Sequence, residues 1–161
     1  MNAKFKNFYL FIISLVLPLL IGYLGSLVTT PAISTWYVTL VKPAFITPPN
    51  WLFGPVWTLL YIMMGIALFL VLKQGKDKLH FRAAWLSFGA QLFLNLYWSL
   101  LFFYIKSPML AFYAIISLWS MIFVNIYYFY QIKKAAAYIM IPYIVWVTFA
   151  AALNYGIWYL N

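Results

Sequence analysis

Five long stretches without a charged side chain are the feature that most constrains how this chain of 161 residues folds. Roughly 20 apolar residues in a helix cross a bilayer core about 30 Å thick, and each of the five stretches reaches that length. The sequence therefore predicts an all-α integral membrane protein, a bundle of five transmembrane helices that forms a single domain over residues 1–161. The expected helices cover about 8–28, 51–72, 83–104, 108–131 and 138–160.

The composition excludes several classes of protein. Hydrophobic residues make up 68% of the chain, against roughly 45 to 50% in a soluble domain. The chain has one acidic residue, Asp77, one histidine, His80, and no cysteine, which excludes disulfide scaffolds, cysteine-ligated zinc and paired-carboxylate catalysis. We expect no metal site and interpret His80 as a solvated loop residue. No ionisable side chain lies well inside a span, which argues against a proton-coupled pump.

The lysines and arginines predict the orientation of the chain, because these residues near span ends stay on the cytoplasmic side. We therefore expect the N-terminus inside and the C-terminus outside. The basic residues separate apolar runs, so nucleic acid is not an expected partner and the lipid bilayer is. A bacterial inner membrane fits this bias, and an organellar membrane is the open alternative. Eight basic residues fall on one side, Lys4, Lys6, Lys73, Lys76, Lys78, Arg82, Lys133 and Lys134, and two on the other, Lys42 and Lys106.

Residues 29–50 form the one long connection, and we expect a lid over the helix ends there. Ser34 is the expected cap of a short interfacial helix that stops at Lys42, before Pro43. The following "AFITPP" should be extended and stiff. An interfacial anchor without a ligand role is an equally weighted alternative.

Polar residues and prolines also mark where two of the long helices begin. Ser107 and Pro108 read as the N-cap and first residue of the fourth helix, and Asn50 as the cap of the second.

Some tryptophans lie too deep for the aromatic belt that forms at membrane interfaces. At about 1.5 Å per residue, Trp57 and Trp98 lie roughly 9 Å below the outer end of their spans. Trp119 and Trp146 lie near mid-span by the same measure. Depth therefore separates these four residues from the belt.

Helical spacing groups the deep residues with neutral polar ones, since residues at i, i+4 and i+7 share a helix face. Gln91, Asn95 and Trp98 form such a set, and Trp146 with Ala150 belongs to another. One interpretation is helix packing through interhelical amide hydrogen bonds. The other is a neutral pocket under the 29–50 connection for a large, flat, mostly apolar ligand. A ligand carboxylate in that pocket could point outward to Lys42.

Three segments carry a resemblance to a known family. The first is "WYVTLVKPAFITPPNWLFGPVWTLLYIMMG" (36–65), with its Trp-Tyr, Lys-Pro, Pro-Pro-x-Trp and Gly-Pro-Val-Trp elements. The others are "QLFLNLYWSLLFF" (91–103) and "PYIVWVTFAAALNYGIW" (142–158). Together they resemble the TspO/MBR family of tryptophan-rich sensory proteins, which includes the translocator proteins, or peripheral benzodiazepine receptors.

The resemblance implies a five-helix bundle, often dimeric, with a pocket closed by the first long loop. It implies that porphyrins such as protoporphyrin IX and heme are ligands, without an obligatory cofactor, and that benzodiazepine-type ligands share the pocket. Some bacterial members degrade porphyrin in light with two pocket tryptophans, which correspond here to Trp57 and Trp146. The positions that match pocket-lining residues are Tyr37, Pro48, Trp57, Gln91, Asn95, Trp98, Trp146 and Ala150.

Two departures from the family pattern bear on function. The segment between Lys-Pro and Pro-Pro is one residue longer than usual, which affects the register of the lid around Phe45 to Thr47. Leu153 and Tyr155 are followed by no basic residue, so the cholesterol motif of the animal proteins is incomplete, which argues against a dedicated sterol carrier.

The leading functional hypothesis is a membrane tetrapyrrole-binding protein that senses or handles porphyrin. A light-dependent porphyrin-degrading enzyme is one alternative, and an uncoupled transporter or carrier of porphyrin, lipid or sterol is another. We also expect a homodimer, for which Gly22 with Ser26, or Ala83 with Ser87, would allow close helix contact.

Overall fold

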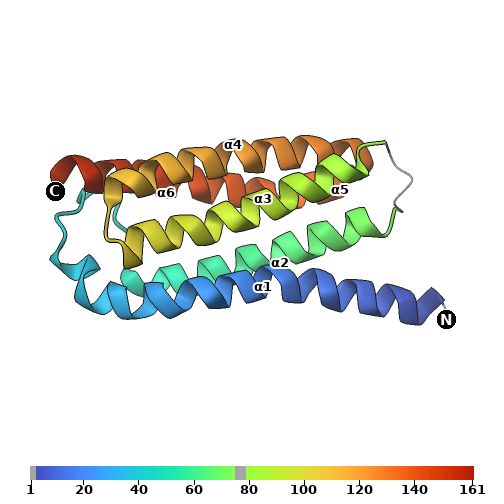
Figure 1. The fold of residues 1–161 in the computed structure, drawn as a ribbon, viewed down its shortest axis with the longest axis horizontal. Coiled ribbons are helices and arrows are strands. Elements are labelled where there is room, and N and C mark those ends of the chain that lie inside the picture. The colour runs from blue at the N-terminus through green and yellow to red at the C-terminus, as the bar shows by residue number, and fades with distance from the viewer. Residues whose placement is uncertain (1–2, 75–78) are drawn as a thin grey trace.

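The structure, a computed structural model, describes residues 3–74 and 79–161, and this part is a bundle of helices with short connections (Figure 1). Five of the helical segments described are long and apolar enough to cross a membrane, which confirms the predicted class. η1 and η2 are single 3-10 turns, and η3 is a π-helical turn that continues α3. The elements are α1 (Ala3–Thr35), η1 (Tyr37–Thr39), η2 (Asn50–Leu52), α2 (Phe53–Leu72), α3 (Phe81–Ser99), η3 (Leu100–Tyr104), α4 (Pro108–Ile132), α5 (Lys134–Ile139) and α6 (Ile141–Leu160).

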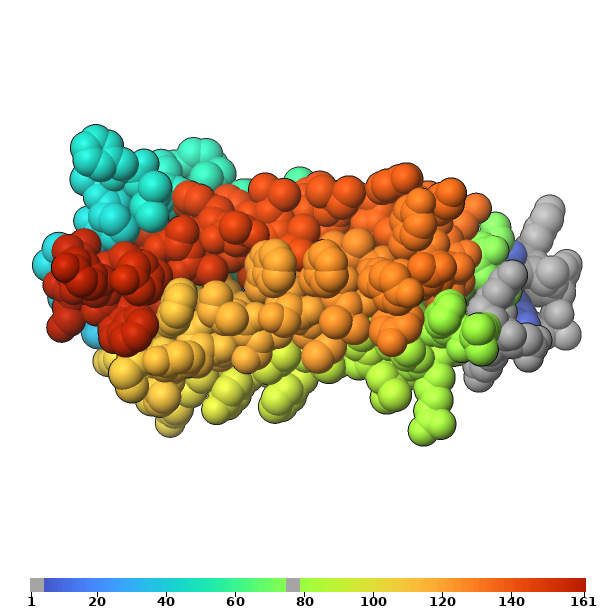
Figure 2. Space-filling view, turned by 90° about the horizontal axis from the view of Figure 1, so that it is seen from above, coloured from blue at the N-terminus to red at the C-terminus, as the bar shows by residue number. Residues whose placement is uncertain are grey.

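The long helices run side by side along one axis in a bundle, with the two ends of the chain at opposite ends of it (Figure 1). α1 packs against α2 and α3, α3 against α4, and α4 against α5 and α6. The connection after α1, the turn between η3 and α4, and Asn161 all lie at one end, which we call the loop end; the opposite end is the far end. Figure 2 shows the connection after α1 standing beside the last turns of α6 at the loop end.

The basic residues separate between these two ends. Lys42 and Lys106 belong to the loop end, whereas Lys73, Arg82 and Lys133 lie at the far end. The orientation was predicted from this same division of the basic residues between two sides. Lys76, Asp77 and Lys78 lie outside the described residues.

The start of α4 agrees with the prediction, and the start of α2 does not. Ser107 is the N-cap of α4, where its hydroxyl accepts a hydrogen bond from the Leu110 N–H at 3.4 Å, and Pro108 is the first helical residue. Asn50 was predicted to cap the second helix, which is wrong, because its side chain makes no capping hydrogen bond. It begins η2 instead, and its main-chain oxygen accepts the N–H of Phe53.

The first connection is shorter than predicted, because α1 continues to Thr35. The prediction that Ser34 caps a new helix is wrong, since the Ser34 and Thr35 hydroxyls both donate to the Pro31 carbonyl inside α1, at 3.2 and 2.8 Å. Serine and threonine hydroxyls inside a helix can donate to the main-chain carbonyl three or four residues earlier. The interfacial helix expected to reach Lys42 is reduced to the single turn η1.

The segment "AFITPP" is not extended throughout, which corrects a second prediction about the lid. The Ile46 N–H and the Thr47 hydroxyl both donate to the Pro43 carbonyl, at 3.2 and 2.8 Å, so residues 44–46 form a turn. A carbonyl that precedes a tight turn can accept two donors, and this contact sets the shape of the lid.

Small residues inside the bundle serve contacts within one chain. A Cβ added to Gly22 would lie 2.5 Å from the Tyr61 ring, and the Ser87 hydroxyl accepts a hydrogen bond from Asn125 of α4 at 3.0 Å. Gly22 and Ser87, which we had considered for contact between copies, are therefore used inside the bundle.

Gly65 allows α1 to approach α2 closely and offers a test of this packing. A Cβ there would lie 2.8 Å from the Leu15 Cα and from the Ser14 carbonyl oxygen, and backbone atoms cannot move aside cheaply. We expect Gly65→Ala to lower the free energy of unfolding by about 1–3 kcal/mol, measured by thermal unfolding in detergent. Gly89→Ala is the matched control, because nothing lies within 4 Å of its Cβ position. Equal melting temperatures for the two variants would contradict this packing.

Candidate functional site

A cavity of about 680 Å³ lies near the loop end, between α1, α2 and the α3–η3 segment. Its size is in the range of small-molecule binding sites, roughly 300–1,000 Å³. Exposed Tyr23 and Trp51 stand at its rim. None of the described lining residues is charged, and its hydroxyl and amide side chains are Tyr23, Ser26, Thr29, Thr30, Asn50, Thr58, Tyr61, Asn95 and Ser99.

Two neighbouring indoles belong to the aromatic part of the cavity wall. Trp57 of α2 and Trp98 of α3 have ring centroids 6.2 Å apart and planes inclined by 32°. The Trp98 indole N–H donates to Asn154 of α6 at 3.0 Å, and its ring stacks on Phe102 at 5.7 Å. Trp98 is thus fixed from two sides, and it supports Trp57. The pair offers the cavity a nearly continuous aromatic surface.

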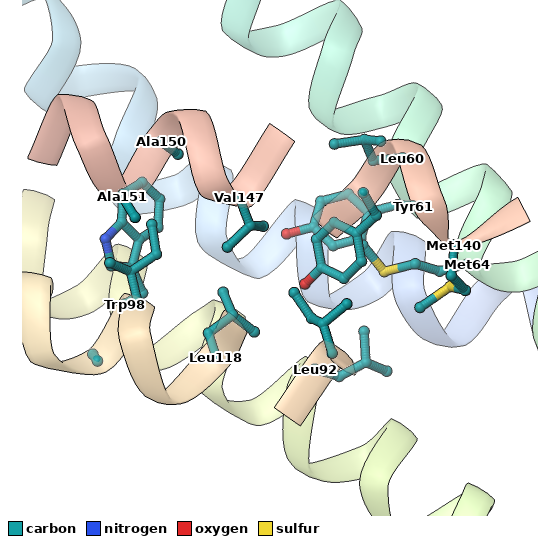
Figure 3. Packing of buried hydrophobic residues seen from close by; sticks show 14 of the residues in the cluster. Leu60, Tyr61, Met64, Leu92, Trp98, Leu118, Met140, Val147, Ala150 and Ala151 are labelled. Carbon is teal, nitrogen blue, oxygen red and sulfur yellow. The ribbon is translucent and has the colours of Figure 1, made fainter. Parts of the chain in front are cut away.

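A chain of hydrogen bonds runs from the cavity into the bundle. The Tyr61 hydroxyl donates to the Asn95 side-chain oxygen at 2.5 Å, and the Asn95 amide donates to the Tyr143 hydroxyl at 3.0 Å. Tyr143 in turn donates to the Gln91 side-chain oxygen at 2.9 Å. Figure 3 shows Tyr61 pointing into the core among apolar side chains of several helices. Because these polar groups are buried together in a membrane bundle, the chain fixes how α2, α3 and α6 face each other.

A second group of aromatic residues lies around Tyr37, which belongs to the η1 turn of the lid. This side chain is 2% exposed, and its ring lies 6.0 Å from that of Phe53. Burial raises the pKa of Tyr37 to about 12, so the hydroxyl keeps its proton at neutral pH. The Lys42 ammonium lies 4.7 Å from the Tyr37 ring centroid and donates to the Leu40 carbonyl at 3.3 Å. The cation therefore caps the Tyr37 ring.

The sequence places this bundle among known proteins. Residues 14–160 match the TspO/MBR family over nearly the whole chain. The chain belongs to the TspO/MBR family. It is 40% identical over 156 residues to the tryptophan-rich protein TspO of Archaeoglobus fulgidus, covering 96% of this chain and 99% of that protein. It is 32% identical over 148 residues to the translocator protein of Bos taurus, with 91% and 86% covered, and 32% over 141 residues to the tryptophan-rich sensory protein of Cereibacter sphaeroides, with 85% of each.

Three of the predicted site residues meet in the cavity of this TspO/MBR chain. Trp57, Asn95 and Trp98 all line it, from α2 and α3. Gln91 does not line the cavity. It is fully buried and accepts the last hydrogen bond of the chain, from Tyr143.

The other predicted site residues lie outside the cavity wall. Tyr37 is buried in the η1 turn of the lid itself, Pro48 is half-buried later in the lid, and Lys42 lies over the Tyr37 ring. Trp146 and Ala150 are on α6, which contributes no described residue to the wall. Figure 3 shows Trp98 directed toward the part of α6 that carries Ala150.

The wall contributed by α1 was not predicted. Gly22, Gly25, Ser26, Thr29 and Thr30 line the cavity from this helix. In the sequence these are small and hydroxyl residues at a spacing that places them on one face of a helix. That spacing indicates a face suited to close contact, but it does not say whether the contact is another helix or a ligand.

The lid of this TspO/MBR chain is tied to α6 by Asn161. The Val41 N–H donates to the Asn161 side-chain oxygen at 3.0 Å, and the Asn161 amide donates to the Val41 carbonyl at 2.9 Å. The same amide donates to the Ile157 carbonyl at 2.8 Å, which fixes it on α6. Next to this contact, a Cβ on Gly156 would lie 2.8 Å from Pro43. The middle of the lid is thus held against the end of α6.

Removing this tie should loosen the lid without unfolding the bundle. We expect Asn161→Ala to speed amide hydrogen exchange at Val41 by about ten-fold, since two hydrogen bonds worth about 0.5–1.5 kcal/mol each are lost. Gln74→Ala is the control, because the hydrogen bonds of Gln74 among the described residues go to Leu70 and Val71 of α2, at the far end. An unchanged exchange rate at Val41 in Asn161→Ala would show that the side chain does not hold the lid.

Proposed function

We propose that this protein binds a tetrapyrrole of the protoporphyrin IX type and senses or handles it within the membrane. The observation that carries the proposal is the indole pair Trp57 and Trp98 on the wall of an uncharged cavity. A flat conjugated ring gains from contact with indole faces, and the surrounding neutral hydroxyl and amide groups supply orientation without a net charge. The name of one relative, the tryptophan-rich sensory protein of Cereibacter sphaeroides, is in line with the sensing part of this proposal.

The cavity suits the tetrapyrrole ring better than it suits a ligated iron. No histidine is among its described lining residues, and His80 lies at the far end, 5.8 Å from the Tyr128 ring. Binding through ring stacking therefore serves the metal-free porphyrin as well as heme. Protoporphyrin IX is accordingly the probe of choice.

Tryptophan fluorescence provides the direct test. Titration of the protein in lipid nanodiscs with protoporphyrin IX should give saturable quenching, because the porphyrin would lie against Trp57 and Trp98. Trp85→Phe should retain most of this quenching, since Trp85 is exposed on α3 and is not on the cavity wall. Quenching that rises without saturation, as expected for porphyrin that only dissolves in the lipid, would contradict the proposal.

Light-dependent degradation of the bound porphyrin is a second candidate, favoured by the position of Trp57. Its indole lines the cavity and lies 5.8 Å from the Tyr61 ring, where an excited porphyrin would contact it directly. Under illumination in air, loss of the Soret band in wild type but not in Trp57→Phe, with binding retained in both, would support turnover. Equal bleaching in wild type and in heat-denatured protein would reject it.

Lys42 is proposed to attract the carboxylates of the porphyrin at the lid. We expect Lys42→Gln to weaken protoporphyrin IX binding about five-fold at low salt and to flatten its salt dependence, because one charge near the membrane surface is lost. Etioporphyrin, which has no carboxylate, should bind both proteins alike. Lys106→Gln is the control, since this exposed loop-end lysine does not line the cavity and, unlike Lys42, has no described contact with the Tyr37 ring. The same salt dependence in Lys42→Gln and wild type would exclude the contact.

We further propose that the loop end faces the outside of a bacterial plasma membrane. The far end carries Lys73, Arg82, Lys133 and Lys134, and the loop end carries Lys42 and Lys106. Basic residues next to short loops favour the cytoplasmic side. The lid and the cavity would then receive ligand from the outer half of the bilayer.

A further inference from the structure

A second cavity, of about 400 Å³, is lined at the loop end by the start of α4, the end of α6 and the first part of the lid. It shares no described lining residue with the first cavity, and none of the positions predicted to line the ligand pocket belongs to it. Trp36 directly follows α1, Lys106 lies in the turn between η3 and α4, and Trp158 belongs to the last turn of α6. Helix ends of a membrane bundle lie at the level of the lipid headgroups. The second cavity is therefore at headgroup depth.

Lys106 gives the second cavity its charge. It is the one charged side chain among the described lining residues, and it is exposed. The single acidic side chain of the protein, Asp77, lies outside the described residues, so no described acidic side chain can neutralise the Lys106 ammonium. A cavity with a cation and without a described counter-charge favours an anionic group.

The backbone at Lys106 is strained, although local folding does not require a lysine there. Its φ is 59°, the one positive φ of a non-glycine residue in the described part of the chain. Glycine and asparagine adopt this conformation at a lower cost than lysine does. The turn is closed by main-chain atoms, because the Ser107 N–H donates to the Leu101 carbonyl at 3.0 Å. A lysine at this position therefore lowers stability while it supplies a charge to the cavity.

Two indoles with available N–H groups also line the second cavity. Trp36 and Trp158 are both half-buried. The ring centroid of Trp36 lies 5.4 Å from that of Phe102, and the ring centroid of Trp158 lies 5.6 Å from that of Phe112. Neither indole N–H has an acceptor among the described residues, whereas the Trp98 indole is bonded inside the bundle. Indoles at a membrane interface keep this polar edge for the wet side, where headgroup oxygens can accept from it.

We propose that the second cavity is a headgroup site for an anionic glycerophospholipid, with phosphatidylglycerol as its probe. The Lys106 ammonium pairs with the phosphodiester, and the Trp36 and Trp158 indoles donate to headgroup oxygens. Met109, an exposed apolar residue of α4 that also lines the site, offers the acyl chains a surface that leads into the bilayer. A free phosphate ion shares the oxyanion chemistry but has no acyl chains. This inference goes beyond the proposed function and does not depend on porphyrin.

A lipid in the headgroup site would lie against the lid. Leu40 of the lid and Asn161 line the site, and Asn161 is the residue that bonds to Val41. We expect phosphatidylglycerol to slow amide hydrogen exchange at Val41 about three-fold relative to phosphatidylcholine, in wild type and not in Lys106→Asn. Equal exchange at Val41 in the two lipids would place any bound lipid elsewhere and would overturn the site.

Thermal unfolding in neutral detergent micelles with added phospholipid measures the binding. Wild type should melt about 3–5 °C higher with phosphatidylglycerol than with phosphatidylcholine of the same acyl chains, because a ligand of the native state stabilises it. In phosphatidylcholine, Lys106→Asn should melt about 1–3 °C above wild type, because asparagine adopts a positive φ more readily. The same variant should lose the gain from phosphatidylglycerol, whereas Lys106→Arg, which keeps the charge, should retain it.

Matched variants separate the headgroup site from general attraction to anionic lipid. Lys73→Gln removes the same charge at the far end, where Lys73 follows α2, and should keep the full gain from phosphatidylglycerol. Trp158→Phe keeps an aromatic ring and removes the N–H, so it should lower the gain by about half. Trp85→Phe, at an exposed indole of α3 outside both cavities, should leave the gain unchanged. A full gain in Trp158→Phe would contradict the role of its indole.

Three results would overturn the headgroup site. The first is an equal loss of the gain in Lys106→Asn and Lys73→Gln, which would indicate attraction between a basic protein and an anionic surface. The second is the same stabilisation by inorganic phosphate in micelles without phospholipid, which would indicate a free anion only. The third is a lower melting temperature of Lys106→Asn in both lipids, which would show that the lysine is used within the protein. No porphyrin is present in these experiments, so their failure leaves the proposed function standing.

Discussion

Replacing Trp57 by alanine is expected to weaken protoporphyrin IX binding by roughly 30- to 150-fold. The indole would contribute about 100 Å² of apolar contact to the ligand, which at about 25 cal/mol per Å² is near 2.5 kcal/mol. Trp57 suits this test better than Trp98, because it makes no side-chain hydrogen bond among the described residues, whereas Trp98 holds Asn154 of α6. The loss should therefore appear in binding more than in stability. Absorbance titration of the Soret band measures the affinity without depending on tryptophan emission.

Trp85→Ala is the matched control for this prediction. Trp85 is 44% exposed, belongs to the same bundle, and does not line the cavity. Its removal should change the affinity for protoporphyrin IX by less than two-fold. Comparable losses in Trp57→Ala and Trp85→Ala would mean that porphyrin binds the protein surface nonspecifically, and the cavity would lose its proposed role.

The membrane spans could be predicted because their cause is local. Each span is an uninterrupted apolar run, and lipid requires that its backbone groups pair within the helix. Ser107 and Pro108 were also predictable, since a cap followed by proline has one favoured arrangement. The prediction at Ser34 was wrong because a serine hydroxyl can bond either inside a helix or as its N-cap. Which of the two occurs depends on whether the preceding helix continues past Pro31, as α1 does.

The cavity could be predicted only in part, because its walls come from helices that are distant in sequence. Depth and spacing found Trp57, Asn95 and Trp98. They could not show which helix stands opposite, so the α1 wall was missed. Depth likewise does not distinguish a pocket from a bundle surface: Trp119, also deep, is exposed on α4, where its N–H donates to Thr148 of α6 at 2.8 Å.

Replacing Asn95 by leucine is expected to lower the free energy of unfolding by about 2–3 kcal/mol. Asn95 is 1% exposed and joins the Tyr61 and Tyr143 hydroxyls from two helices. Hydrogen bonds inside membrane bundles are worth about 0.6 kcal/mol on average, so most of the loss comes from the Tyr61 hydroxyl left without an acceptor. Unfolding with increasing denaturing detergent would measure it, and Ser117→Ala, at an exposed serine, should be neutral.

The double variant Asn95→Leu with Tyr61→Phe decides whether this explanation is correct. The second substitution removes the hydroxyl that the first leaves unpaired, so the double variant should be more stable than Asn95→Leu alone by about 1 kcal/mol. Simple additivity of two losses would instead assign the effect of Asn95→Leu to packing around a leucine. Because Asn95 and Tyr61 also line the cavity, recovery of stability without recovery of porphyrin affinity would show that the hydrogen-bond chain supports the bundle and the ligand through separate contributions.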